Sequence, residues 1–248
     1  MRFIRAAIRF ILFLFATLGL YGFWWLASFF VPNKVRWRQV IFYAWTKSFA
    51  VLSGMKIEVK GTPPQPPFFL VSNHLSYTDI AAIRAVATGI FVAKYEVSQW
   101  PVIGKIVSDM GTIFINRQNR RDIPRAGKVI IDRLSQGEAV IVFPEGTSTK
   151  GETIIPFNSS FLQFAAEGNV PVSYCSVSYR TDSDGPPASA RICWWEDIGF
   201  LKHIWRHLQL KKYTAIISFG DSPITNPDRK LLAAELRDRV EAIFTPVL

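Results

Sequence analysis

Cysteine and histidine are scarce in this chain of 248 residues, which holds two cysteines and three histidines. Two cysteines cannot build a disulfide framework, and both Cys175 and Cys193 lie in apolar runs that predict small buried side chains. Buried, reduced thiols suit a cytoplasmic compartment. His203 and His207 stand four apart on an expected helix, but no third ligand lies nearby in the sequence. We therefore expect no metal site.

Acidic residues are missing from the start of the chain, where the first one is Glu58. The first 60 residues hold nine bases and one acid, a local charge of +8 out of a total of +10. Bases flank an uncharged apolar run, 10–31, which as a helix would be about 33 Å long and could cross a bilayer core of ~30 Å. A cleaved signal peptide and a buried core helix are the alternatives. The length of the run and the lack of a small-residue cleavage site disfavour the first, and the flanking bases disfavour the second.

Bases on both sides of the run leave its orientation open. A hairpin with a second helix over 38–52 would place both ends on the cytoplasmic face, where each base attracts anionic headgroups by roughly 1 kcal/mol. Nucleic acid is the weaker partner because no nucleic-acid motif accompanies the charge. We expect residues 1–60 to anchor the protein to the cytoplasmic face of the inner or plasma membrane and residues 61–248 to form a catalytic domain.

Strand-like and helical stretches alternate after a proline-rich turn at 61–67. This alternation predicts an α/β fold with a central, mostly parallel sheet flanked by helices. The segment 200–208 is amphipathic and basic, which favours packing on the core, with a membrane-surface helix as the alternative. Asn226 and Pro227 are expected to begin the last helix. The expected strands are 68–72, 112–116, 139–143, 172–179, 190–195 and 214–219, and the expected helices are 78–87, 125–136, 159–167, 200–210 and 229–244.

A histidine and a carboxylate, His74 and Asp79, stand five residues apart where an expected strand gives way to a helix. Histidine is suited to move a proton near neutral pH, and a carboxylate beside it can fix its tautomer and stabilise the imidazolium. The same segment fits a capping box, with Ser76 as N-cap and Asp79 at the third helical position. A carboxylate has enough lone pairs for both roles.

Two other expected strands deliver polar residues at their carboxyl ends. Glu145 and Gly146 follow strand 139–143, at the edge where active sites of open α/β sheets gather and where a glycine admits a ligand close to the backbone. Arg117 follows strand 112–116 and could hold a phosphate by two parallel hydrogen bonds. A solvated glutamate in a structural turn and a surface arginine are the alternatives.

Together, and in order, these segments resemble the blocks of the glycerolipid (lysophospholipid) acyltransferases. Residues 73–79 (NHLSYTD) are similar to N-H-x-S-x-x-D, and residues 111–117 (GTIFINR) to G-x-I-F-I-D-R, with Asn116 in place of aspartate. Residues 143–147 (FPEGT) are similar to the start of F-P-E-G-T-R-S, and 170–172 (VPV) to a fourth block. Residues 94–97 (KYEV) resemble a K-x-E-L segment.

The resemblance implies a membrane-bound O-acyltransferase of phospholipid biosynthesis. It would move an acyl chain from acyl-CoA or acyl-carrier protein to the free hydroxyl of a lysophospholipid such as 1-acyl-glycerol-3-phosphate, with no tightly bound cofactor. His74 would be the general base and Asp79 its orienting partner. The turn at Gly146 is one candidate source of backbone N–H donors for the oxyanion. The residues that would bind substrate are Arg117, Glu145, Gly146, Thr147 and Lys94.

One departure from the pattern concerns the acceptor. Ser148 stands where family members that act on glycerol-phosphate lipids usually carry an arginine, and serine cannot make a bidentate phosphate contact. Lys150 could compensate as a point charge. Residues 157–161 (FNSSF) are similar to relatives that acylate other lysolipids, including lyso-ornithine lipid, which is therefore the alternative acceptor. A non-catalytic membrane-anchored scaffold is a further alternative, opposed by the presence of both His74 and Asp79.

Overall fold

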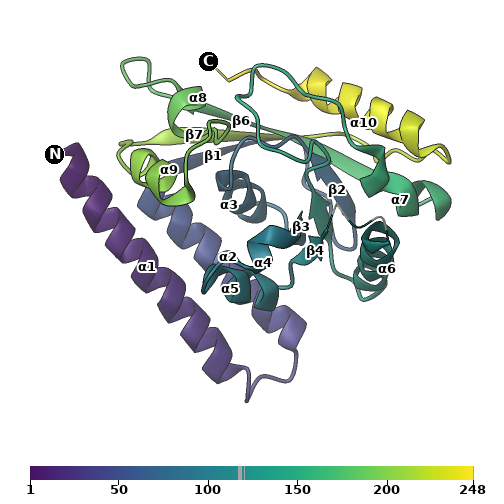
Figure 1. Cartoon of the computed structure of the whole chain (residues 1–248), viewed down its shortest axis with the longest axis horizontal. Coiled ribbons are helices and arrows are strands. Elements are labelled where there is room, and N and C mark those ends of the chain that lie inside the picture. The colour runs from purple at the N-terminus through teal and green to yellow at the C-terminus, as the bar shows by residue number, and fades with distance from the viewer. Residues whose placement is uncertain (117–118, 120, 248) are drawn as a thin grey trace.

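The computed structural model describes residues 1–116, 119 and 121–247. In this part of the chain a seven-stranded sheet has the order β1-β7-β6-β2-β5-β3-β4 (Figure 1). All neighbouring pairs are parallel except β6 and β7. The α/β fold with a mostly parallel sheet is confirmed. The strands are β1 (Met55–Lys60), β2 (Phe69–Ser72), β3 (Ile90–Lys94), β4 (Ile113–Ile115), β5 (Val140–Val142), β6 (Val172–Thr181) and β7 (Tyr213–Phe219).

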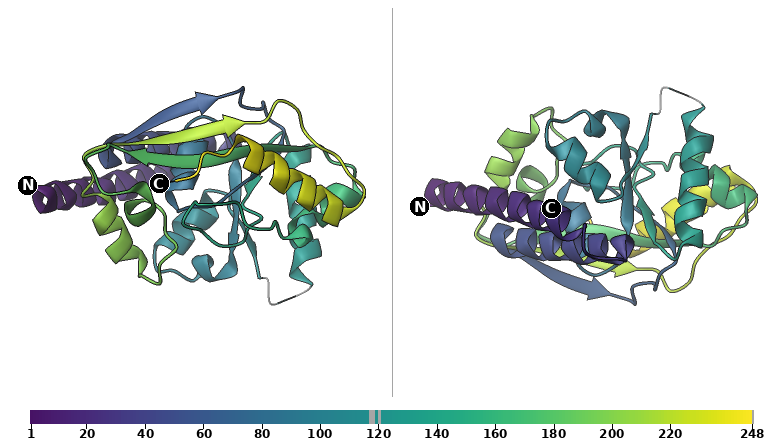
Figure 2. Two further views of the ribbon diagram at one scale, coloured as in Figure 1. Left: turned by 90° about the horizontal axis from the view of Figure 1, so that it is seen from above. Right: turned by 90° about the horizontal axis from the view of Figure 1, so that it is seen from below.

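Helices cover both faces of the sheet, so its central strands are apolar on both sides. In β2, Leu70 faces the core that α2 and α3 close, whereas Phe69 and Val71 face the core that α6, α7 and α10 close. Figures 1 and 2 show α2 and α10 on opposite faces of the sheet. The helices are α1 (Arg2–Ala27), α2 (Lys34–Ser53), α3 (Thr78–Arg84), α4 (Tyr95–Ser98), α5 (Ile103–Asp109), α6 (Asp122–Ser135), η1 (Ser159–Leu162), α7 (Gln163–Glu167), α8 (Ala188–Arg191), α9 (Phe200–His207) and α10 (Arg229–Ile243).

The first two helices form the expected hairpin, with α1 running back along α2 (Figure 1). Trp45 of α2 donates a hydrogen bond to Thr17 Oγ1 at 3.0 Å, and Trp37 donates one to the carbonyl of Trp24 at 3.1 Å. Near its start, α1 is tied to the rest of the fold by Arg9, which donates to the carbonyl of Lys211 at 3.0 Å. Among the described residues, α1 alone is long and apolar enough to cross a membrane, judged by length and composition.

Three features of the observed topology differ from the expected elements. Residues 190–195 are not a strand: Pro186 and Pro187 precede the short helix α8, and β7 already pairs on both edges, so no free edge is available there. Strands β1 and β3 were not expected, and β1 adds residues 55–60 to the sheet through β7. The last helix is capped by Asp228, because its side chain, and not that of Asn226, accepts from the first-turn backbone.

Candidate active site

His74 and Asp79 meet where β2 gives way to α3. The strand ends at Ser72, a short loop carries His74, and Asp79 lies in the first turn of the helix. The His74 Nδ1 atom is 2.8 Å from Asp79 Oδ2. The Asp79 side chain is fully buried, whereas 22% of the His74 side chain is exposed. The pair expected from the sequence therefore forms, with its imidazole open to solvent and its carboxylate closed off.

Asp79 accepts hydrogen bonds from four donors. Its Oδ2 atom accepts from the backbone N–H groups of Leu75 at 2.7 Å and Ser76 at 2.9 Å as well as from His74, and its Oδ1 atom accepts from the Tyr179 hydroxyl at 2.6 Å. An ionised carboxylate only accepts, so the imidazole proton lies on Nδ1 and the lone pair on Nε2. Such an imidazole is ready to act as a base through Nε2.

The capping role expected of this segment is present as well. The bond from Ser76 N–H to Asp79 is the reciprocal half of a capping box. The other half of a capping box would be a bond from the N–H of residue 79 to the Ser76 side chain. Here Ser76 Oγ accepts from Thr78 N–H instead, at 3.3 Å, and Tyr77 occupies the N-cap position. Asp79 therefore caps its helix and orients His74 at once.

Strand β5 supplies the wall behind the imidazole. The rings of His74 and Phe143 stack with centroids 4.3 Å apart and an interplanar angle of 16°, and Phe91 of β3 stacks on Phe143 in turn. The backbone of His74 is held on both sides: its N–H donates to Glu145 at 2.6 Å, and its carbonyl accepts from Thr149 N–H at 2.9 Å. The hydrogen bond from His74 to Glu145 thus joins the block at 73–79 to the block at 143–147.

Glu145 is directed at the backbone. It accepts from His74 N–H through Oε2 and from Ile155 N–H through Oε1, the latter at 3.1 Å. The side chain is buried, and this burial raises the pKa of Glu145 to about 8 although both backbone donors oppose the shift. These contacts make Glu145 a support of the loop that carries His74. A contact with the acceptor, as expected from the sequence, stays a prediction.

The other residues expected to bind substrate are Gly146, Thr147, Lys94 and Arg117. Gly146 adopts a φ of +76°, a conformation that favours glycine, and Thr147 after it is exposed. Lys94 ends β3 and is exposed on the same edge of the sheet. Arg117 lies outside the described residues. The structure therefore brings His74, Glu145 and Lys94 to the carboxyl ends of the neighbouring strands β2, β5 and β3.

Ser148 and Lys150 are engaged within the protein. The Ser148 hydroxyl donates to the carbonyl of Trp194. The Lys150 Nζ atom is 2.6 Å from Glu152 Oε1 and 5.7 Å from the centre of the Trp195 ring. Both side chains therefore have partners within the protein.

Two residues that support the site, Val177 and Tyr179, were not identified from the sequence. Tyr179 bonds to Asp79 from β6, and the Asn73 side chain bonds both backbone groups of Val177, donating to its carbonyl at 2.9 Å and accepting from its N–H at 2.7 Å. Asn73 belongs to the first block, but its partner is 104 positions away. No local pattern marks Val177 or Tyr179, because each contact depends on how β2 and β6 pair.

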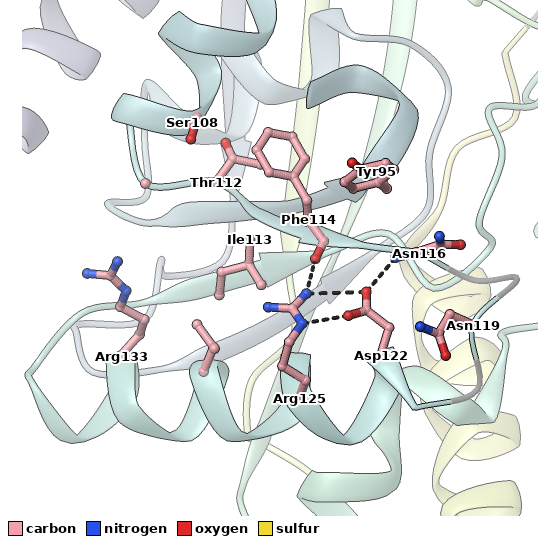
Figure 3. Close-up of a pocket in the computed structure, with 12 residues that line it drawn as sticks. Tyr95, Ser108, Thr112, Ile113, Phe114, Asn116, Asn119, Asp122, Arg125 and Arg133 are labelled. Carbon is pink, nitrogen blue, oxygen red and sulfur yellow. Dashed lines mark hydrogen bonds and ion pairs between the residues drawn. The ribbon is translucent and has the colours of Figure 1, made fainter. Parts of the chain in front are cut away.

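A separate cleft of about 570 Å³ follows the outer edge of β4 (Figure 3). Arg125 donates to the Phe114 carbonyl at 2.6 Å and pairs with Asp122, which accepts from Asn116 N–H at 2.6 Å. The Arg125 guanidinium lowers the pKa of the Asp122 carboxyl. These side chains cover the polar backbone of an edge strand. His74 does not line this cleft, so it is distinct from the candidate active site.

The two histidines of α9 face the protein interior. His203 Nδ1 is 3.0 Å from the Tyr77 hydroxyl and its Nε2 is 3.1 Å from the Cys193 carbonyl. Ile204 and Leu208 are buried, so the helix packs on the core, as the sequence favoured. Both cysteines are free and buried. Within the described ranges, no three His, Cys, Asp or Glu side chains are grouped to hold a metal ion.

Known proteins are similar to this chain in sequence and in fold. A family model described as acyltransferase matches residues 56–178. A 1-acyl-sn-glycerol-3-phosphate acyltransferase of Neisseria meningitidis is 30% identical over 192 residues, covering 75% of this chain and 74% of the relative. A lyso-ornithine lipid O-acyltransferase of Pseudomonas aeruginosa is 31% identical, covering 84% and 80%. The crystal structure of a 1-acyl-sn-glycerophosphate acyltransferase from Thermotoga maritima has a TM-score of 0.71 at 21% identity, over 98% of this chain and 95% of the other.

Proposed function

The chain belongs to the acyltransferase family, and on this premise we propose that it transfers an acyl chain from a thioester to the free hydroxyl of a lysolipid at a membrane surface. The observation that carries the proposal is the His74–Asp79 pair, with its 2.8 Å contact and its buried carboxylate. A non-catalytic scaffold is disfavoured, because Asp79 is held by four donors, one of which is His74 Nδ1, and this contact leaves Nε2 of His74 available as a general base.

The proposed reaction begins with the acceptor hydroxyl against His74 Nε2. The imidazole takes the hydroxyl proton as the oxygen attacks the carbonyl carbon of the thioester. Asp79 stabilises the imidazolium that forms. The carbon–sulfur bond then breaks, the new ester keeps the acyl group, and the imidazolium returns its proton to the departing thiolate. Acyl-CoA or acyl-carrier protein would supply the thioester.

The acceptor is proposed to be a lysolipid of one of two kinds. The relatives quoted above are named for 1-acyl-glycerol-3-phosphate and for lyso-ornithine lipid. The internal bonds of Ser148 and Lys150 support including the second beside the first, since both side chains have partners within the protein. Lyso-ornithine lipid, which has no phosphate, is therefore the second candidate and is tested beside lysophosphatidate.

We propose that α1 embeds its apolar outer face in the cytoplasmic leaflet. Its outward residues include Phe3, Ile4, Ile8, Ile11, Leu12, Phe15 and Leu18, all exposed. Its other side is held by α2, where Arg38 is buried in an ion pair with Glu138, so α2 belongs to the catalytic body. A helix fixed along such a body suits an in-plane position better than a free span.

The test is a transfer assay with full-length protein in detergent. One labelled acyl chain is offered as the coenzyme A thioester or the carrier-protein thioester, with lysophosphatidate or lyso-ornithine lipid as acceptor, and product is measured by mass spectrometry. His74→Ala should lower the rate by about 10²–10⁴-fold, because it removes the general base. Product with only one acceptor decides between the two lipids. No product from any combination, or His74→Ala activity above about a tenth of wild type, contradicts the proposal.

A further inference from the structure

Tyr179 of β6 contacts the carboxylate of the candidate pair from the side opposite His74. Its hydroxyl donates to Asp79 Oδ1 at 2.6 Å, across 100 positions of sequence. Both side chains are buried, Tyr179 at 2% and Asp79 at 0% exposure. Burial, followed by the charge of Asp79, raises the pKa of the Tyr179 hydroxyl well above its ordinary value, so the hydroxyl stays a donor at all working pH values.

The two oxygens of Asp79 have different partners. Oδ2 accepts from His74, Leu75 and Ser76, all within the same loop. At Oδ1, among the described residues, the bond comes from Tyr179. A carboxylate that is hydrogen-bonded at one oxygen can rotate about its Cβ–Cγ bond. Hydrogen bonds to both oxygens restrict this rotation and fix the plane of the carboxylate. The plane of Asp79 sets the direction in which His74 Nδ1–H points, and hence where Nε2 faces.

We propose that Tyr179 is a positioning residue for this site: by holding Asp79 Oδ1, it fixes the imidazole of His74 in the orientation that presents Nε2 to the acceptor hydroxyl. The inference rests on the proposed function and deepens it. Tyr179 lies behind the carboxylate, touches neither reactant, and acts only through Asp79.

The position of Tyr179 is itself determined by the first block. The amide of Asn73 bonds the N–H and carbonyl of Val177, two residues before Tyr179 on the same face of β6. This clamp continues the pairing of β2 with β6 beyond Ser72, where the strand ladder ends. The Tyr179 ring also contacts Tyr213 of β7, with centroids 6.1 Å apart. Strand pairing therefore brings the hydroxyl to Asp79.

The test compares Tyr179→Phe with the matched control Tyr213→Phe. Tyr213 is equally buried, and its hydroxyl lies 3.0 Å from Ser53 Oγ, so the control removes a buried hydrogen bond that does not reach Asp79. We expect Tyr179→Phe to lower kcat about ten-fold, the lower end of the range for a hydrogen bond to a charged group, with KM unchanged. Tyr213→Phe should keep the wild-type kcat even if it loses thermal stability.

A second readout does not depend on turnover. The Nδ1 proton of His74 gives a downfield resonance in proton NMR when it is held against Asp79, and its position reports that hydrogen bond. The resonance should move or broaden in Tyr179→Phe and stay in place in Tyr213→Phe. A wild-type resonance and kcat in Tyr179→Phe overturn the inference and leave the proposed function standing. Absence of acyl transfer in the wild-type protein overturns the proposed function, and the resonance then still decides whether Tyr179 orients the pair.

Discussion

Replacing Asp79 by asparagine separates the two roles that this residue fills in the structure. An asparagine at this position can keep its oxygen where Oδ2 accepts from His74, Leu75 and Ser76, and turn its NH₂ group toward Tyr179. The Tyr179 hydroxyl can accept as well as donate, so the amide finds a partner. Asp79→Asn therefore retains the helix cap and the His74 tautomer and removes only the negative charge.

The size of the effect follows from the contact between the two groups. With 2.8 Å between His74 Nδ1 and Asp79 Oδ2, the centres of charge of an imidazolium and a carboxylate lie about 4 Å apart. At an effective dielectric constant of ~20, that separation corresponds to ~4 kcal/mol of attraction, or about 10³-fold in rate. If Asp79 served only as a cap, asparagine would replace it at little cost, since an amide oxygen can accept the same two backbone N–H bonds.

The assay is steady-state acyl transfer at pH 7.5 with saturating thioester, together with thermal unfolding of each variant. Asp228→Asn is the control, because Asp228 also accepts from two backbone N–H groups at a helix start, at 2.7 and 3.1 Å, and this helix is α10 and not the one that carries Asp79. We expect Asp79→Asn to be folded and about 10³-fold slower, and Asp228→Asn to match wild type. A rate for Asp79→Asn within ten-fold of wild type would refute the charge-stabilising role.

Two further changes test the packing that supports the site. His207 is fully buried, and neither of its ring nitrogens has a hydrogen-bond partner among the described residues. Burial lowers its pKa to about 3, so the folded state loses stability as the pH falls below about 6.5. The stability of His207→Leu relative to wild type should therefore be about 2 kcal/mol more favourable at pH 5 than at pH 8, and parallel pH–stability curves would contradict this. A Cβ at Gly111 (φ +89°) would lie 2.7 Å from Cζ of Arg38, which pairs with Glu138. Gly111→Ala should therefore lower the free energy of unfolding more than Gly137→Ala, where φ is +81° and no atom of the described residues lies within 4 Å of the added Cβ. Equal losses, of ~1–3 kcal/mol from backbone strain alone, would show that Arg38 moves aside without cost.

Much of the site was predictable because its central contacts are local. His74 and Asp79 lie five residues apart across one strand end and one helix start, so the sequence of this segment nearly specifies their meeting. Glu145 was placed correctly at the end of β5. Its bonds to the backbone N–H groups of His74 and Ile155 were not foreseen, because they depend on how the loop at 144–155 folds over His74.

The strands were predictable where apolar runs were long. The prediction failed where the pairing of strands decided whether a segment joins the sheet. β2 and β5 are buried on both faces and read clearly as strands. Residues 190–195 are apolar apart from Arg191 but do not pair with the sheet, whereas the amphipathic segment at β1 pairs with β7. Strand propensity describes a half-buried surface and cannot say which edge is vacant.

The sequence by itself determined the order of the blocks, the apolar helix at the start of the chain and the pairing of His74 with Asp79, since each rests on spacing or hydrophobicity within a short segment. The tertiary structure alone decided that Tyr179 holds the second oxygen of Asp79, that Asn73 clamps Val177, and that Ser148 is bonded to Trp194. These contacts join residues 46 to 104 positions apart. They exist because strand register and loop packing bring the atoms within bonding distance, which spacing along the chain does not encode.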